Sequence, residues 1–150
     1  MLIPKNKNCF VFYSLPPFSD NARAMYEYIK KRTPTYKIVW LVNDLNSVKR
    51  LKEKHNLSAY YLISITGVWF MLRSYMFFFT HSIPLMAEIK GRNQKLICLW
   101  HGMPLKAMGY LDKTERISYL RNLSLFSRAV DKMIATSAIA KNALCSCFCI

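Results

Sequence analysis

The 150-residue sequence has no uninterrupted apolar segment long enough to cross a lipid bilayer. Its longest apolar stretch, 67–79 ("GVWFMLRSYMFFF"), is interrupted by Arg73, whereas a membrane-spanning helix needs about 20 consecutive apolar residues. The first residues, "MLIPKNKNCFVFYS", lack the apolar core of a secretion signal. We therefore expect no transmembrane helix and no signal peptide, and a location in the cytoplasm or against the cytoplasmic face of a membrane.

Acidic residues are scarce. Eight Asp and Glu face 22 Lys and Arg, which gives a formal net charge of +14 at pH 7. This excess favours a polyanionic partner, such as nucleic acid, an anionic membrane surface or a phosphate-rich substrate. Lys and Arg are spread evenly along the chain, and the signatures of common nucleic-acid-binding motifs are missing. We therefore expect no nucleic-acid partner, although charge alone leaves that alternative open.

Cysteine pairs at zinc-binding spacing are also missing. Three of the five cysteines, Cys145, Cys147 and Cys149, alternate in "CSCFC", which does not match the two-residue spacing of a zinc knuckle. We interpret the five cysteines as buried or incidental thiols in a reducing compartment, with metal capture by this segment as the alternative. The sequence predicts neither a metal site nor a cofactor.

Apolar residues are plentiful, at 53%, which is ample for the core of one domain over 1–150. Buried-strand patterns alternate with amphipathic helical ones. Strands are predicted at 9–14, 36–44, 59–64, 75–82, 95–102 and 131–137, and helices at 21–32, 46–56, 66–74, 112–130 and from 138 onward. This alternation predicts an α/β fold with an open parallel sheet covered on both faces. Ligands of such sheets bind beyond the carboxyl ends of the strands.

The end of the fifth predicted strand carries the clearest candidate site. His101 follows the apolar run there. Histidine has an ordinary pKa near neutrality, which suits a general base acting on a hydroxyl. Gly102 allows close backbone approach to a ligand, and Pro104 suits the first turn of a helix, whose free N–H groups bind phosphate. Lys106 adds a positive charge. The alternative is a histidine that only hydrogen-bonds a loop.

Other strand ends add weaker candidates. Asp20 and Asn21 could orient an acceptor or cap the helix that they begin. Ser137 could bind phosphate or cap the last helix. His81 could line the same cleft as the fifth strand end or serve the turn that follows it. Tyr119 is expected on the apolar stripe of helix 112–130.

Three segments resemble the CDP-glycerol glycerophosphotransferase family, which includes teichoic acid primases and polymerases. "LWHGMPLKAMG" (99–109) is similar to the family's W-H-G-x-P-x-K segment. "FYSLPPFSDNARAMYEYI" (12–29) looks like its first strand, loop and helix, and "MIATSAIAKNAL" (133–144) looks like its late Thr-Ser strand end. The three segments occur in the family's order and span most of the chain.

The resemblance implies a Rossmann-like sheet that forms the N-terminal half of a GT-B glycosyltransferase fold. It also implies transfer of glycerol phosphate, or a related polyol phosphate, from a CDP-polyol donor to a hydroxyl of a membrane-bound teichoic acid acceptor. His101 matches the family's proposed base. In the family the nucleotide site lies mainly in a second domain, so 1–150 is expected to be the acceptor-side domain, peripherally attached to the cytoplasmic membrane face. The alternative is a truncated, non-catalytic module that binds anionic polymer or membrane.

Overall fold

The computed structural model describes residues 3–81, 84–102 and 107–149, so the predicted site residues Pro104 and Lys106 lie outside the described residues. The strands are β1 (Asn6–Tyr13), β2 (Lys37–Val42), β3 (Ala59–Tyr61), β4 (Ser74–Phe79), β5 (Lys95–Cys98) and β6 (Lys132–Met133). The helices are α1 (Asp20–Arg32), α2 (Leu45–His55), α3 (Ile65–Arg73), α4 (Pro84–Ile89), the short 3₁₀ helix η1 (Gly109–Leu111), α5 (Ile117–Ala129) and α6 (Ala138–Phe148).

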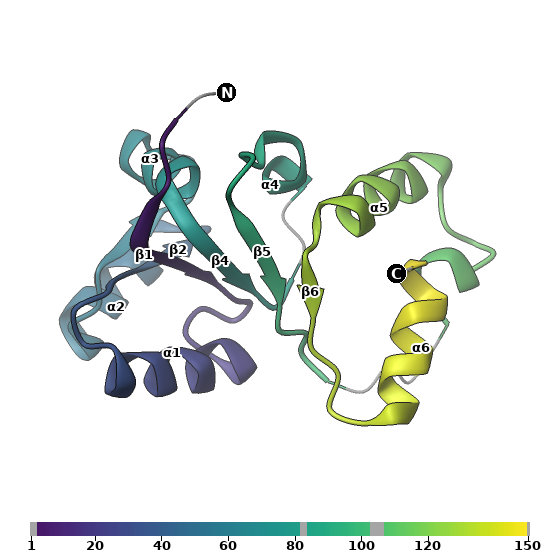
Figure 1. The fold of residues 1–150 in the computed structure, drawn as a ribbon, viewed down its shortest axis with the longest axis horizontal. Coiled ribbons are helices and arrows are strands. Elements are labelled where there is room, and N and C mark those ends of the chain that lie inside the picture. Colours follow the sequence, from purple (N-terminus) through teal and green to yellow (C-terminus); the bar gives the residue numbers. More distant parts are fainter. Residues whose placement is uncertain (1–2, 82–83, 103–106, 150) are drawn as a thin grey trace.

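The six strands form one parallel sheet in the order β3-β2-β1-β4-β5-β6 (Figure 1). The chain builds outward from β1 to β3 and then returns to place β4 on the other side of β1. The order therefore reverses between β1 and β4, as in doubly wound Rossmann-type sheets. The predicted parallel α/β sheet is confirmed.

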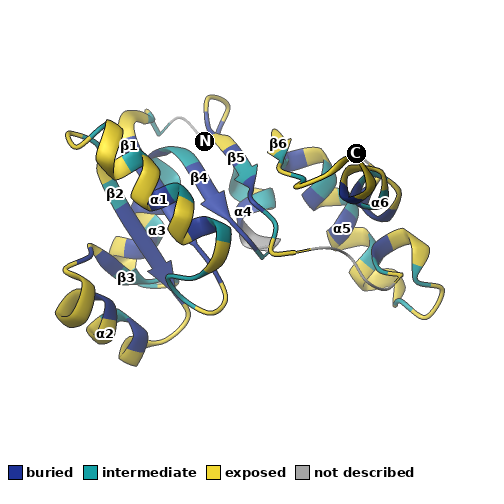
Figure 2. Cartoon of the chain, turned by 90° about the horizontal axis from the view of Figure 1, so that it is seen from below, coloured by how far each residue is buried: buried dark blue, intermediate teal, exposed yellow. Residues whose placement is uncertain are grey.

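Helices cover both faces of this sheet (Figure 1). On one face, alternate residues of β1, including Val11, pack with Phe77, Leu96 and side chains of α3 to α6. On the other face, Phe12 and Trp40 pack against α1 and α2, with their rings stacked 5.2 Å apart between centroids. Figure 2 shows buried strands inside helices whose outer faces are exposed. Burying such a side chain contributes about 1.5–3 kcal/mol, so packing on both faces stabilises the central strands.

Four predicted strands are three or four residues too long at their carboxyl ends. Strands 59–64 and 75–82 end at Tyr61 and Phe79. Strand 95–102 is correct only as far as Cys98, because Trp100 takes a φ of 54° that turns the chain out of the sheet. Strand 131–137 contains only the two residues of β6, since Ser137 already begins the approach to α6 as its N-cap. The sheet ends sooner than predicted at these places, and irregular backbone carries the candidate residues.

The helix predictions were also incomplete. The predicted helix 112–130 begins only at Ile117, because the carboxylate of Asp112 accepts hydrogen bonds from the backbone and hydroxyl of Thr114 and forms a turn there. Neither α4 nor η1 was predicted. Both are short, with six and three residues, which is too few for a helical period to show in the sequence.

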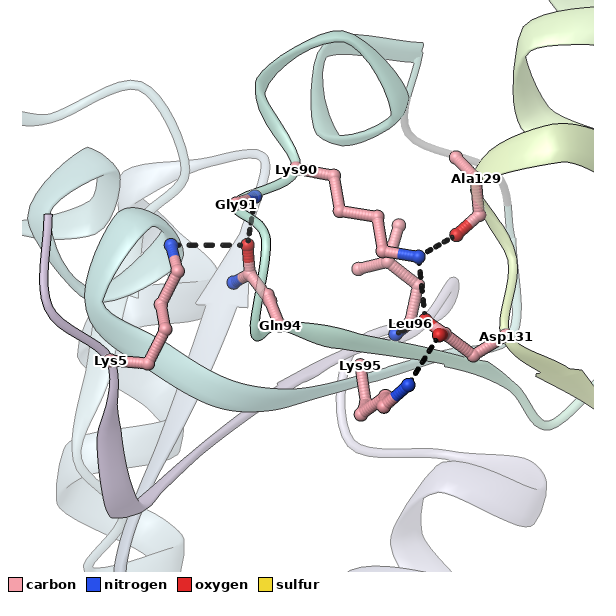
Figure 3. A network of polar contacts seen from close by, with 8 residues as sticks. All are labelled: Lys5, Lys90, Gly91, Gln94, Lys95, Leu96, Ala129 and Asp131. Atoms are coloured by element: carbon pink, nitrogen blue, oxygen red, sulfur yellow. Dashed lines mark hydrogen bonds and ion pairs between the residues drawn. The ribbon is translucent and has the colours of Figure 1, made fainter. Parts of the chain in front are cut away.

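A polar network fastens the edge of the sheet opposite the predicted ligand-binding edge (Figure 3). The carboxylate of Asp131 accepts hydrogen bonds from Lys90 and Lys95, at 2.7 and 2.9 Å, and from the backbone N–H of Leu96 at 2.8 Å. Partial burial alone would raise the pKa of Asp131, but these three donors hold it below its usual value. The network therefore joins the amino-terminal ends of β5 and β6.

Candidate functional site

The strand-order reversal between β1 and β4 places a crevice beyond the carboxyl ends of these strands. A cavity of about 530 Å³ lies there. Leu15 follows β1, Thr80 and His81 follow β4, and Trp100 and His101 follow β5, and all five line this cavity. A cavity therefore lies at the strand end where the sequence placed its candidate site, and His101 lines it.

His101 is held in a defined orientation. Its Nδ1 lies 2.9 Å from the backbone carbonyl oxygen of Thr80. Because a carbonyl oxygen can only accept a hydrogen bond, an uncharged His101 must carry its proton on Nδ1. The lone pair is then on Nε2, and the residue is exposed. The arrangement can accept a proton at Nε2, as a general base requires.

His81 lies flat against His101. The two ring centroids are 4.2 Å apart and the ring planes differ by 10°. Nδ1 of His81 is 2.9 Å from Oγ1 of Thr80, so Thr80 contacts both imidazoles. Burial lowers the pKa of His81, the charge of His101 lowers it further, and the carboxylate of Asp20 opposes both effects. Of the two interpretations left open for His81, the structure supports its place in the cleft.

Asn21 reaches the site from α1. Its side-chain Nδ2 donates hydrogen bonds to the carbonyl oxygens of Leu99 and Trp100, at 3.0 and 3.1 Å. These are the two residues immediately before His101. The side chain of Asn21 therefore bonds to the loop that presents the imidazole and forms no helix cap.

Asp20 begins α1 with a φ of 52° and is exposed. Ser19 occupies the N-cap position without a side-chain capping bond, and its hydroxyl lies 3.2 Å from the Asp20 carboxylate. Helix capping by Asp20 is therefore not what the structure shows. Burial has the largest effect on the pKa of His81 and lowers it, and the negative charge of Asp20 opposes this lowering.

The other two described candidates differ in position. Gly102 directly follows His101 and has a φ of 153°, and among the described residues no atom lies within 4 Å of an added Cβ. The hydroxyl of Ser137 accepts the backbone N–H of Ala140 at 3.1 Å and so caps α6. Ser137 lines a different groove, of about 480 Å³, with Lys141. The structure does not bring Ser137 to the cavity of His101.

Several cavity residues were not predicted as site residues. Tyr119 was expected only on the apolar stripe of its helix; it is 43% exposed and lines the cavity with Glu115 and Asn122. Burial and the carboxylates of Glu115 and Asp112 raise the pKa of Tyr119, so its hydroxyl stays protonated near neutral pH. No local pattern marks these residues, because only the packing of α5 on the sheet brings them to His101.

Nucleophilic thiol chemistry is not favoured at this site. Cys98 lines the cavity, but it is buried, and burial raises the pKa of its thiol to about 12. A thiol that stays protonated is a poor nucleophile. Within the described ranges, no group of three or more His, Cys, Asp or Glu side chains is placed to hold a metal ion. Among the residues that the structure describes, no helix is long and apolar enough to span a membrane.

The strand order and its crevice define a Rossmann-like domain of the kind that forms one half of a GT-B glycosyltransferase fold. Solved structures of the wall teichoic acid polymerase TagF share this fold. One, of a variant soaked with CDPG, has a TM-score of 0.84 and 23% identity over 97% of this chain and 37% of that chain. A further TagF structure gives a TM-score of 0.82 at 22% identity.

The chain belongs to the CDP-Glycerol:Poly(glycerophosphate) glycerophosphotransferase family, whose model it matches over residues 1–150. It is 26% identical to a teichoic acid poly(glycerol phosphate) polymerase of Bacillus spizizenii, over 98% of this chain and 39% of that protein. It is also 26% identical to the polymerase of the same description in Bacillus subtilis, over 80% of this chain and 17% of that protein. The chain thus spans about two fifths or less of the length of these relatives.

Proposed function

We propose that this chain is the acceptor-side half of an enzyme that transfers glycerol phosphate, or a related polyol phosphate. The donor is a CDP-polyol, and the acceptor is a hydroxyl of a membrane-bound, cell-wall teichoic acid polymer. Family membership and the polymerases among its relatives support the reaction class. The single observation that carries the proposal is the bond from Nδ1 of His101 to the Thr80 carbonyl, which leaves Nε2 as the basic atom beside the cavity.

In this mechanism His101 is the general base. The acceptor hydroxyl binds in the cavity, and its oxygen attacks the phosphorus that carries the polyol. The new oxygen–phosphorus bond forms as the bond to the CMP oxygen breaks, and CMP leaves with the electron pair. Nε2 of His101 takes the hydroxyl proton. A positioned base typically accelerates such a step by roughly 10²–10⁴-fold.

Phosphate binding is assigned to the segment after His101. Gly102, which allows close backbone approach to a ligand, supports this assignment, and Pro104 and Lys106 enter it from the sequence alone. We propose that a second Rossmann-like domain outside these 150 residues supplies the nucleotide contacts, as expected for a chain that matches about two fifths of its relative. The net charge of +14 supports peripheral attachment to the anionic cytoplasmic face of the membrane.

The decisive experiment is His101→Asn in a two-domain protein that carries this chain as its first half. We expect turnover to fall by roughly 10²-fold or more while the thermal unfolding temperature stays near that of the parent. The control is Asn142→Ala, on the exposed surface of α6, which should leave turnover unchanged. Near-normal turnover in the His101 variant would contradict the proposal.

A second candidate function is a non-catalytic module that binds anionic polymer or membrane. A groove of about 420 Å³ on α1 and α2 favours it, because Lys30 and Lys31 line this groove together with Arg23, which is ion-paired with Glu27 at 2.8 Å. Binding of this kind should weaken steeply with salt. Sedimentation with vesicles that contain anionic lipid, at low and high salt, tests it. Salt-insensitive or absent binding counts against this second function.

A further inference from the structure

Two imidazoles share one buried anchor at the carboxyl edge of the sheet. β4 and β5 are neighbours in register, and Phe79 lies opposite Cys98. Thr80 follows β4 directly and is fully buried. Its carbonyl oxygen accepts the Nδ1–H of His101, and its hydroxyl contacts Nδ1 of His81. Thr80 therefore fixes the edge of each ring while the faces of the rings stack.

We propose that His81 is a positioning residue for His101. The flat contact between the rings keeps the His101 imidazole in the plane in which Nδ1 reaches the Thr80 carbonyl and Nε2 stays free. The consequence for catalysis rests on the proposed function, but the positioning itself does not. Neither family membership nor the names of the relatives assigns a role to this residue.

The need for a second ring follows from the exposure of His101. The terminal torsion of histidine is broad and roughly two-fold, and His101 is exposed. A tilt of the ring out of its plane would move Nδ1 away from the Thr80 carbonyl, and no partner would then hold the proton on Nδ1. One hydrogen bond at a solvent-accessible position opposes this tilt only modestly. The His81 ring, stacked at 4.2 Å, adds a surface against which the imidazole keeps its plane.

The charge on His81 also matters, because two parallel imidazoles this close repel each other when both are protonated. Burial and the charge of His101 lower the pKa of His81, and Asp20 on α1 partly offsets this. From the α5 side, Glu115 and Tyr119 line the same cavity. Near neutral pH His81 is therefore uncharged, and it does not repel the proton that His101 takes up.

The test is side-chain ¹⁵N NMR of the 150-residue chain. The sequence contains three histidines, so His55→Asn and His101→Asn variants assign the signals. At a pH of about 8, above the ordinary histidine pKa, we expect His101 to carry its proton on Nδ1. His81→Phe keeps a flat, uncharged ring and should preserve this tautomer. His81→Ala should lower the ratio of Nδ1–H to Nε2–H forms by roughly threefold or more.

Each outcome is decisive. An Nε2–H tautomer of His101 in the unaltered chain overturns the proposal. So does an unchanged tautomer ratio in His81→Ala, provided that its backbone amide spectrum remains that of the folded chain. If His81→Ala does not fold, His81→Leu fills the space without a flat ring and takes its place, with the same expected shift and the same refuting result.

A kinetic measurement separates this proposal from the proposed function. In the two-domain protein, His81→Ala should lower kcat by roughly tenfold with little change in KM, and His81→Phe should recover most of that loss. Equal kcat in the two variants would argue against positioning. If the NMR shifts occur but His101→Asn keeps its turnover, the proposed function fails while the positioning by His81 stands.

Discussion

Asn21→Ala tests how the fold presents His101. The side chain of Asn21 donates two hydrogen bonds to carbonyl oxygens that lie 78 and 79 residues away in sequence. A net contribution of about 0.5–1.5 kcal/mol for each bond gives an expected loss of about 1–3 kcal/mol. One acceptor, the carbonyl of Leu99, belongs to a residue that is only 2% exposed, which limits its replacement by water.

The assay is thermal and urea unfolding of the chain. For a chain of this size 1 kcal/mol corresponds to about 2–4 °C, so Asn21→Ala should unfold roughly 3–10 °C lower. Asn142→Ala, on the exposed surface of α6, is the matched control and should change stability by less than about 0.5 kcal/mol. In the Asn21→Ala variant, the side-chain signal of His101 should also shift, because the loop before His101 loses its two hydrogen bonds to Asn21.

Asn21→Asp tests the same contacts with a side chain of nearly the same shape. The introduced carboxylate has no N–H and faces two carbonyl oxygens, so at pH 7 it should destabilise more than Asn21→Ala. Repulsion raises the pKa of the new carboxyl, so the protonated form is stabilising below that pKa and its benefit is lost as pH rises. The deficit relative to Asn21→Ala should therefore shrink as pH falls through that raised pKa, and the shrinkage should be complete near the ordinary Asp pKa of about 4. An Asn21→Ala variant as stable as the parent, with an unmoved His101 signal, would refute the reasoning.

Two further predictions concern the scaffold. Gly109 has a φ of 58°, and an added Cβ would lie 2.2 Å from the carbonyl oxygen of Cys147. Gly109→Ala should therefore cost about 2–4 kcal/mol in urea unfolding, and a cost below about 1 kcal/mol would argue against this contact. Asp131→Asn should cost about 1–2 kcal/mol at pH 7, because charge-assisted bonds are lost at a partly solvated position. The folded-state pKa of Asp131 is lowered, so this stabilisation is present above the ordinary carboxyl pKa and lost as pH falls. A deficit that persists unchanged into acid would contradict this account.

The central strands could be predicted from the sequence because their signal is local. β1, β2 and β4 are strands of six to eight residues whose carboxyl-terminal residues are buried, and such strands appear as continuous apolar runs. β6 could not be bounded in this way. It has only two residues. Next to it, the backbone N–H of Leu96 donates its hydrogen bond to the side-chain carboxylate of Asp131 and not to a backbone carbonyl of β6.

The candidate site also contains residues that a local sequence pattern could predict and residues that it could not. The position of His101 after a buried strand is a local pattern, and it was predicted. The contacts of Asn21 with Leu99 and Trp100 join positions far apart in sequence, and the alternatives weighed for Asn21 did not include them. Tyr119 was predicted only as part of the apolar stripe, because helical periodicity assigns a face of the helix but does not show that a cavity lies beside it.

The strand register explains why His101 meets Thr80 at all. Phe79 lies opposite Cys98, so two strands that stayed extended would place Thr80 opposite Leu99 and carry His101 beyond it. The φ of 54° at Trp100 turns the chain back. For a residue with a side chain, this left-handed conformation costs about 1–2 kcal/mol. It is offset where it arises, because the Trp100 carbonyl accepts a bond from Asn21 and the indole packs edge-on against Phe148 on α6. His101 is thus placed by one turn of the backbone at Trp100, which contacts with α1 and α6 stabilise. Changes at Asn21 should therefore affect His101 without a direct contact between the two residues.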